Sequence, residues 1–245
     1  MKQRRALVTG GTRGIGRAIA AALSARGHAV TILARDRDAI ARAVQEGIAA
    51  SGEAVDVRDI AALFRLAEAG GFEILVNNAG GATTAPFQKT DLDAFRSMFA
   101  LNVESAIATT QACLPGMIAG GFGRVVNVAS TAGLKGYGYV SAYVAAKHAV
   151  VGLTRSLALE VARKGVTVNA VCPGYTETDL VAASVAGIMA KTGRSEDDAR
   201  AHFAAQNPMG RLVRPDEVAD TVAWLVGEDA SSVTGQAIVI AGGEL

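Results

Sequence analysis

The chain has 245 residues, a net charge of +1 and a composition in which half of the residues are hydrophobic. That length suits one large α/β domain or two small ones, with ample apolar material for a core. The small net charge gives no electrostatic case for binding nucleic acid or an anionic membrane. No apolar stretch approaches the roughly 20 residues that span a bilayer, and the N-terminal apolar run is too short for a signal peptide, so we expect a soluble cytoplasmic protein.

The two cysteines, Cys113 and Cys172, form no CxxC pair, and no histidine lies near either of them in metal-ligand spacing. We therefore expect no metal site and two free thiols in a reducing compartment. The histidines also lack matching partners for a serine hydrolase.

Short apolar runs alternate along the chain with longer segments of helical spacing. The runs are continuously apolar, which is typical of strands buried on both faces of a parallel sheet. The predicted strands are residues 5–9, 29–33, 54–57, 73–77, 124–128, 166–171 and 237–240. The predicted helices are residues 14–26, 37–50, 59–69, 92–119, 141–163 and 215–227. This alternation predicts a single doubly wound α/β domain, a Rossmann fold, with about seven parallel strands and helices on both faces.

Residues 178–210 interrupt the alternation with a helical, moderately charged insertion. In a doubly wound fold such an insertion should lie over the carboxyl ends of the strands, where ligands bind. We expect a substrate lid there, and an additional helical pair without a role in binding is the alternative.

The first predicted strand leads directly into a glycine-rich turn, in which Gly10, Gly14 and Gly16 lie within seven residues. Glycines let the backbone bend sharply and approach phosphate groups without a Cβ in the way. The helix that begins in this turn offers free N–H groups and the positive end of its dipole to a pyrophosphate. The turn by itself is also compatible with a structural role, since its spacing is G-x-x-x-G-x-G.

The end of the second strand bears on which dinucleotide is bound. NAD-binding sites place a carboxylate there for the ribose 2′-OH, but this strand ends at Ala34 and Arg35 follows it. Arg13 lies inside the glycine turn. Two guanidinium groups favour a 2′-phosphate, and hence NADP(H) over NAD(H). Asp36 keeps NAD(H) open, because a shift of two residues would restore an acid.

Two further strand ends carry polar or small residues. Asp56 could accept a hydrogen bond from an adenine amino group, or it could be a helix N-cap or turn acid. The segment 77–80, Asn-Asn-Ala-Gly, places small residues where the backbone would pass close to the adenosine ribose. In isolation this segment would be only a turn.

Ser130, Tyr143 and Lys147 form the candidate catalytic group. Tyr143 and Lys147 are four residues apart in a helical pattern, so both project from one face. The pKa of a tyrosine is ordinarily near 10, and an adjacent ammonium would lower it and make Tyr143 a usable acid or base near neutral pH. Ser130 should lie at the carboxyl edge of the sheet, where its hydroxyl could hold a substrate carbonyl oxygen. A Tyr/Lys pair on a surface ridge is the structural alternative.

With these residues in this order, the chain resembles the short-chain dehydrogenases/reductases in their compact single-domain subtype. The resemblance covers nearly the whole length, and its motifs are residues 9–16, Asp56, residues 77–80, Asn102 in Leu-Asn-Val, Ser130, Tyr143 with Lys147, Pro173-Gly174 and Thr178. It implies that Tyr143 donates the proton in carbonyl reduction, that Lys147 lowers the pKa of Tyr143 and binds the nicotinamide ribose, and that Ser130 orients the substrate. It also implies that Asn102 kinks its helix and holds a water in a proton relay from Lys147.

The same resemblance implies a cofactor site, NADP(H) being preferred and NAD(H) possible. Its residues would be Gly10, Thr12, Arg13, Gly14, Ile15, Gly16, Arg35, Asp56, Val57, Asn78, Ala79, Gly80, Tyr143, Lys147, Pro173, Gly174 and Thr178. Pro173, Gly174 and Thr178 would meet the nicotinamide end. Relatives of this kind often form tetramers through their long helices and last strand, so we expect a homotetramer.

Residues 141–148 and 169–174 are similar to 3-oxoacyl reductases, polyketide ketoreductases and 3-hydroxybutyrate dehydrogenases, which handle a ketone or alcohol β to a carbonyl. Substrate contacts are expected from residues 81–87, residues 134–139 and the lid. Three basic residues of the lid could meet the phosphates of a CoA or carrier-protein thioester, or form only a solvated helix face: Lys191, Arg194 and Arg200.

The leading hypothesis is therefore NADPH-dependent reduction of a 3-oxoacyl thioester. An alternative within the enzymes is an NAD(P)-dependent dehydrogenase of a 3-hydroxy acid or an alicyclic secondary alcohol. A remote alternative is a dinucleotide-sensing protein without turnover.

Overall fold

One seven-stranded parallel sheet organises the protein. The structure is a computed structural model that describes residues 2–245, apart from the side chains at positions 180 and 191. The strand order is β3-β2-β1-β4-β5-β6-β7. The strands are β1 Arg5–Thr9, β2 Ala29–Ala34, β3 Ser51–Ala54, β4 Ile74–Asn77, β5 Gly123–Val128, β6 Val166–Pro173 and β7 Ala237–Ile240. The predicted Rossmann fold is confirmed.

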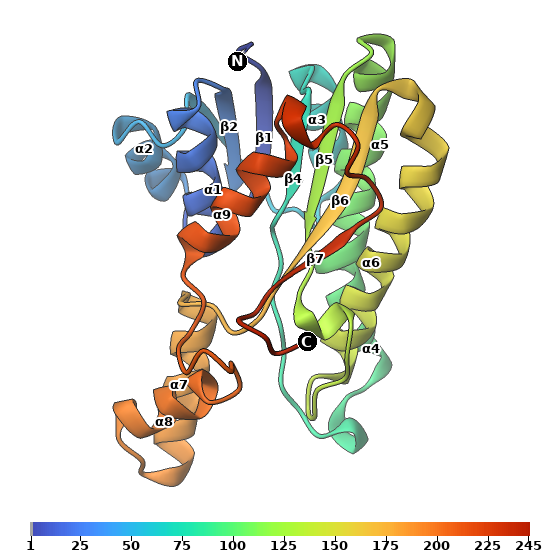
Figure 1. Ribbon diagram of the computed structural model, residues 1–245. Coiled ribbons are helices and arrows are strands. Elements are labelled where there is room, and N and C mark those ends of the chain that lie inside the picture. Colours follow the sequence, from blue (N-terminus) through green and yellow to red (C-terminus); the bar gives the residue numbers. More distant parts are fainter. Residues whose placement is uncertain (1) are drawn as a thin grey trace.

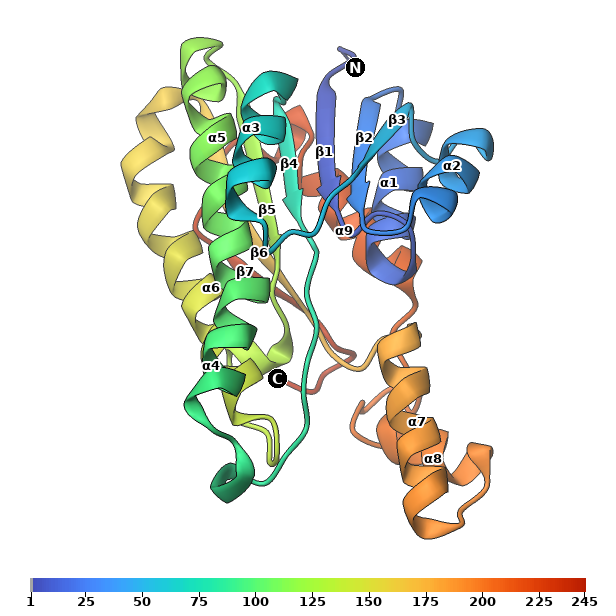
Figure 2. The ribbon, with the colours of Figure 1, turned by 180° about the vertical axis from the view of Figure 1, so that it is seen from behind.

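Helices cover both faces of this sheet (Figures 1 and 2). On one face lie α1 Gly14–Ala25, α2 Arg37–Gln45 and α9 Pro215–Leu225; on the other lie α3 Ile60–Gly70, α4 Leu92–Phe99, α5 Ser105–Ala119 and α6 Ser141–Val161. Within the described residues no helix is long and apolar enough to cross a membrane.

The core consists of two apolar layers, one on each face of the sheet. Leu7 and Val8 are consecutive residues of β1, and both are fully buried, but they pack into different layers. Val8 lies in the layer with Ile19 of α1, whereas Leu7 lies with Leu63 of α3 and Met117 of α5. Because successive strand residues point to opposite faces, a strand covered on both sides needs an unbroken apolar run. This requirement accounts for the pattern seen in the sequence.

Two elements differ from the sequence prediction. The third strand is Ser51–Ala54, not residues 54–57, because β3 pairs only with β2 at the edge of the sheet and so needs no apolar run. The single helix predicted for residues 92–119 is two helices, α4 and α5, joined by a π-helical turn at Ala100–Glu104.

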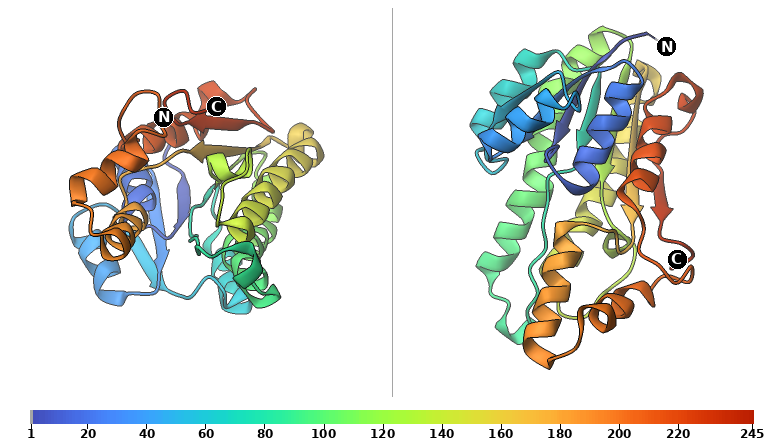
Figure 3. Two further views of the ribbon diagram at one scale, coloured as in Figure 1. Left: turned by 90° about the horizontal axis from the view of Figure 1, so that it is seen from below. Right: turned by 90° about the vertical axis from the view of Figure 1, so that its left-hand side faces the viewer.

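The insertion forms two helices, α7 Asp179–Thr192 and α8 Glu196–Ala204. They have a small apolar core of their own, in which Val185 packs with Phe203 and Leu212. Figures 1 and 3 show both helices beyond the carboxyl ends of the strands, as the sequence led us to expect.

Strands β1 to β3 are added in one direction across the sheet, and β4 to β7 are added in the other. The two halves meet between β1 and β4, which are adjacent although β2 and β3 separate them in the sequence. In open α/β sheets the crevice outside the carboxyl ends at such a switch point is where ligands bind. The glycine turn follows β1, and residues 77–80 include the end of β4, so both segments lie at this switch point.

Candidate active site

Ser130 and Tyr143 meet at the carboxyl edge of the sheet. Ser130 follows β5, and its hydroxyl oxygen accepts a hydrogen bond from the backbone N–H of Ala132 at 3.1 Å. The side chains of Ser130 and Tyr143 are hydrogen-bonded to each other. The structure thus joins two residues from separate elements, and Tyr143 is not part of a surface ridge.

Lys147 is buried one helical turn beyond Tyr143. The residue is 5% exposed, and Nζ donates a hydrogen bond to the carbonyl oxygen of Val128 at 2.8 Å. Nζ lies 5.7 Å from the centroid of the Tyr143 ring. Burial lowers the pKa of Lys147 to about 8, since a charged ammonium is costly away from water.

The pKa of Tyr143 differs from the sequence expectation. Burial raises it, and the hydrogen bond with Ser130 offsets only part of that effect. We expected Lys147 to lower this pKa, but the ammonium is bonded to the Val128 carbonyl rather than to the phenol oxygen. The raised pKa keeps the proton on Tyr143 at neutral pH, which is the state that a proton donor requires.

Asn102 lies in the π-turn and holds the loop that follows β4. Its amide donates to the carbonyl oxygens of Gly81 at 3.1 Å and Met98 at 3.0 Å, and its own carbonyl oxygen accepts from the Gly81 N–H at 3.4 Å. A Cβ built on Gly80 would lie 2.6 Å from the Asn102 oxygen and 3.5 Å from Lys147 Nζ. Asn102, Gly80 and Lys147 therefore converge, and the helix is distorted at the residue for which a kink was expected.

The glycine turn is braced by the segment after β4. The amide of Asn78 donates to the carbonyl oxygens of Thr9 and Gly10 at 2.9 and 3.2 Å. The Thr9 hydroxyl accepts from the backbone N–H groups of Asn78 and Ala79 at 3.0 and 2.9 Å. A Cβ on Gly16 would clash with both the Asn78 amide nitrogen and the Gly10 oxygen, so only glycine fits there.

The first turn of α1 fits a pyrophosphate. Gly10 and Gly14 have φ angles of +67° and +51°, which glycine adopts without strain. Arg13 at the N-cap makes no side-chain capping bond, and the first turn contains no acidic residue. By contrast, Asp36 and Asp59 cap α2 and α3. The N–H groups at the start of α1 thus have no competing side-chain acceptor, as a bound phosphate requires. Thr12 and Ile15 belong to the same turn.

The carboxylate that follows the end of β2 is that of Asp36, and it caps a helix. Asp36 accepts hydrogen bonds from the N–H groups of Asp38 and Ala39 at 2.9 and 3.0 Å, so its carboxylate caps α2. The side chain of Arg35 is exposed. Arg13 forms an exposed ion pair with Asp179 at 3.4 Å, which is a weak interaction in water.

Asp56 lies two residues beyond β3 and has a partner within its own turn. Its oxygens accept from Nε and Nη2 of Arg58 at 3.1 and 2.6 Å, and from the Arg58 backbone N–H at 3.0 Å. These bonds lower the pKa of Asp56 to about 2. This is the turn-acid arrangement, and the contact with adenine stays a prediction, as does the contact at Val57, which is 7% exposed.

The nicotinamide end predicted from the sequence lies beside the glycine turn. Pro173 is the last residue of β6, and Thr178 is the N-cap of α7. A Cβ on Gly14 would lie 3.3 Å from the methyl group of Thr178. The start of the predicted lid therefore contacts the glycine turn.

Three basic residues of the lid were candidates for contact with a thioester's phosphates, with a solvated helix face as the alternative. The guanidinium of Arg200 is paired with Glu177 at 2.6 Å, and Arg194 is exposed. The side chain of Lys191 lies outside the described part of the chain.

Sequence reasoning missed the penultimate residue, Glu244. Its side chain is 4% exposed, forms an ion pair with Lys135 at 3.0 Å and accepts a hydrogen bond from the Tyr137 hydroxyl. No motif indicated this contact, because 107 residues separate Tyr137 from Glu244.

Comparison with known proteins decides the family. The family model described as short chain dehydrogenase matches residues 4–188. This chain belongs to the short-chain dehydrogenase family. It is 39% identical to a putative ketoacyl reductase of Streptomyces coelicolor, over 97% of this chain and 95% of that protein. It is 41% identical to the D-beta-hydroxybutyrate dehydrogenase of Cupriavidus necator, over 94% of this chain and 93% of that protein.

Solved structures support the same conclusion. This short-chain dehydrogenase aligns with a crystal structure of a single-residue variant of actinorhodin polyketide ketoreductase with NADPH, at a TM-score of 0.93 and 36% identity. The alignment covers 99% of this chain and 97% of the ketoreductase. The protein is thus an oxidoreductase that acts on a ketone or secondary alcohol with a nicotinamide cofactor.

Proposed function

We propose that this short-chain dehydrogenase uses NADPH to reduce the 3-oxo group of an acyl thioester. The observation that supports the cofactor choice is the capping role of Asp36, whose Oδ1 accepts from two N–H groups of α2, while the side chain of Arg35 beside it is exposed. The putative ketoacyl reductase and the NADPH-bound ketoreductase among its relatives support both the cofactor and the substrate.

The proposed cofactor site follows the switch point of the sheet. The N–H groups of α1 would hold the pyrophosphate, Arg35 and Arg13 the 2′-phosphate, and Lys147 the nicotinamide ribose. When bound, the nicotinamide supplies the hydride for reduction.

Tyr143 would donate the proton that converts the ketone oxygen to a hydroxyl. Its hydrogen bond with Ser130 supports this role, because one carbonyl oxygen could accept from both hydroxyls. Ser130 would orient that oxygen, and the ammonium of Lys147 would stabilise the phenolate left on Tyr143. Asn102 would hold the water through which the proton is replaced.

Helices α7 and α8 would close over the substrate. They lie beyond the carboxyl ends of the strands, and their own apolar core would let them move as a unit. The ion pair between Arg13 and Asp179 links the start of α7 to the glycine turn. Cofactor binding at Arg13 would therefore change a contact of the lid.

Association of the chain is the second part of the proposal. Large apolar side chains are exposed on three elements that pack at the outside of the fold: Leu159 of α6 is 83% exposed, Trp224 of α9 is 47% exposed and Val239 of β7 is 36% exposed. Side chains of this kind gain free energy when a second copy covers them. We propose a homotetramer of single-domain subunits.

A second candidate is oxidation of a 3-hydroxy acid, which the likeness to the hydroxybutyrate dehydrogenase favours. The two functions differ in the charge beside the reacting carbon, since a thioester is neutral at its carbonyl and a free acid is anionic.

The test compares NADPH and NADH in the reduction of 3-oxobutanoyl-CoA by the wild type and by Arg35→Ala. We expect the wild type to consume NADPH in preference to NADH, and Arg35→Ala to lose about tenfold or more in kcat/KM for NADPH while changing less than about twofold for NADH. That loss corresponds to one charge-assisted hydrogen bond. Arg42→Ala, which removes an exposed arginine within α2, is the matched control. Equal losses for the two cofactors would contradict the 2′-phosphate site.

A further inference from the structure

A buried charge pair joins the C-terminal tail to the loop between Ser130 and Tyr143. Glu244 forms an ion pair with Lys135 at 3.0 Å, and the side chains are 4% and 35% exposed. Tyr137 donates its hydroxyl to the same carboxylate oxygen of Glu244 and lies 2.7 Å from the Thr131 hydroxyl. A carboxylate this deeply buried is stable only with such partners.

This pair involves the loop of residues 134–139, which the sequence predicts to contact the substrate. Lys135 and Tyr137 belong to the loop that separates Ser130 from Tyr143. A Cβ on Gly174 would lie 2.8 Å from the second oxygen of Glu244. Gly174 follows β6, which is adjacent to β5. Figure 1 shows the C-terminus at the carboxyl edge of the sheet.

The tail that carries Glu244 is held in a fixed path. Gly242 and Gly243 have φ angles of +56° and +91°. A Cβ on Gly242 would clash with the Asn207 side-chain oxygen, and a Cβ on Gly243 would lie 3.5 Å from Pro208. The tail is therefore packed against the segment that follows α8, and Glu244 cannot swing away from Lys135 without breaking these contacts.

The ion pair of Lys135 with Glu244 carries no net charge. Lys135 is partly exposed, and its ammonium could accept an anion if Glu244 did not occupy it. A substrate carboxylate that displaced Glu244 would leave a buried acid without its cation, which is costly. An uncharged ester or thioester requires no such exchange.

We propose that Glu244 is a specificity-determining residue: by neutralising Lys135 it makes the site select uncharged 3-oxoacyl groups and reject free 3-oxo acids. This inference rests on the proposed function, because it concerns the substrate of the same site. The selection acts chiefly against the free acid, because its carboxylate would have to displace Glu244 from Lys135 at a cost in free energy.

The experiment measures kcat/KM with NADPH for ethyl 3-oxobutanoate and for 3-oxobutanoate, and takes the ratio of ester to acid. Two variants should shift this ratio in opposite directions. Glu244→Gln frees the ammonium of Lys135 and should move the ratio toward the acid by about tenfold or more. Lys135→Met leaves the negative charge of Glu244 and should move it toward the ester by a similar factor. Either variant alone tests the proposal if the other fails to fold.

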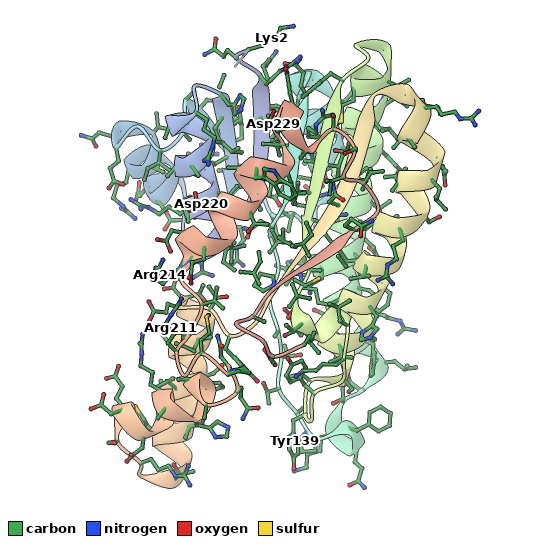
Figure 4. The ribbon with its side chains drawn as sticks, in the orientation of Figure 1. Lys2, Tyr139, Arg211, Arg214, Asp220 and Asp229 are labelled. Carbon is green, nitrogen blue, oxygen red and sulfur yellow. The ribbon has the colours of Figure 1, made fainter. Side chains whose placement is uncertain are left out.

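Two controls separate charge from structure. Glu244→Asp keeps the charge and should leave the ratio within about threefold of wild type. Asp220→Asn removes one negative charge, as Glu244→Gln does, but on α9, where Asp220 pairs with Arg26 on the outside of the fold (Figure 4). It should leave the ratio unchanged.

A second measurement needs no turnover. Calorimetry gives the affinities of the NADPH-free protein for 3-hydroxybutanoate and for its ethyl ester. If the wild type reduces neither substrate, the proposed function fails, and the ratio of these two affinities still decides the role of Glu244. A ratio that Glu244→Gln and Lys135→Met leave unmoved, or move in the same direction, would overturn the proposal.

Discussion

Lys147 is a candidate catalytic residue whose buried ammonium lowers the stability of the folded state. The usual pKa of 10.5 falls to about 8 because the ammonium is buried, with the Val128 carbonyl as its hydrogen-bond acceptor. Between these two values the unfolded chain binds a proton that the folded chain does not. The folded state is therefore penalised by this group below pH 8, and the penalty is relieved as the pH rises toward 10.5.

We predict that Lys147→Met stabilises the fold and abolishes catalysis. The fall in pKa from 10.5 to about 8 corresponds to about 3 kcal/mol, and loss of the bond to Val128 offsets part of it. The free energy of unfolding at pH 7, measured with urea, should rise by about 1 to 2 kcal/mol. The difference between variant and wild type should shrink between about pH 8 and about pH 10. A variant that is less stable at pH 7 would refute this account of the buried charge.

The sequence predicted which residues come together at the candidate catalytic site, but it did not predict their pKa values. Ser130, Tyr143 and Lys147 were identified as candidates from their spacing and from the strand that precedes Ser130, and the structure brings them to one edge. Their pKa values depend on burial and on which acceptor Lys147 faces. Both are properties of the three-dimensional packing, so a sequence pattern could not supply them.

The π-turn between α4 and α5 is the element that brings a buried amide to the site. One wide turn rotates Asn102 so that its side chain bonds to Gly81 and Met98 instead of pointing along the helix face. The sequence pattern predicted an unbroken helix, because a π-turn leaves the apolar spacing on either side almost unchanged. The strand β3 was predicted three residues too late, because a strand at the edge of the sheet does not require an apolar run.

We expect Asn102→Ala to loosen the loop after β4. It removes three hydrogen bonds, two with the half-buried backbone of Gly81 and one to the buried carbonyl oxygen of Met98. The free energy of unfolding should fall by about 2 to 3 kcal/mol, and NADPH should bind more weakly. Ser105→Ala is the matched control, since it removes one hydrogen bond, from the Ser105 hydroxyl to the carbonyl oxygen of Leu101, and it should cost about 1 kcal/mol or less. An Asn102→Ala variant as stable as Ser105→Ala would contradict the role of Asn102 in holding the loop after β4.

Segments far apart in the sequence meet at the carboxyl edge of one sheet. The glycine turn, the loop after β4, the start of α7 and the C-terminal tail contribute to one region, as Figures 1 and 3 show. The order of strands and helices predicted this convergence for the motifs, because each of them follows a strand. It did not predict the tail: Glu244 reaches Tyr137 through a packing arrangement that no local signal marks.

In the proposed reaction Tyr143 donates the proton, while other residues bind the cofactor. The most direct measurement is NADPH consumption with ethyl 3-oxobutanoate by the wild type and by Tyr143→Phe, together with the NADPH dissociation constant of each. We predict a loss of about 100-fold or more in kcat with a dissociation constant within about threefold of wild type, since the phenol hydroxyl contributes general acid catalysis and not the phosphate contacts. Activity retained in Tyr143→Phe, with NADPH bound normally, would contradict this role of Tyr143.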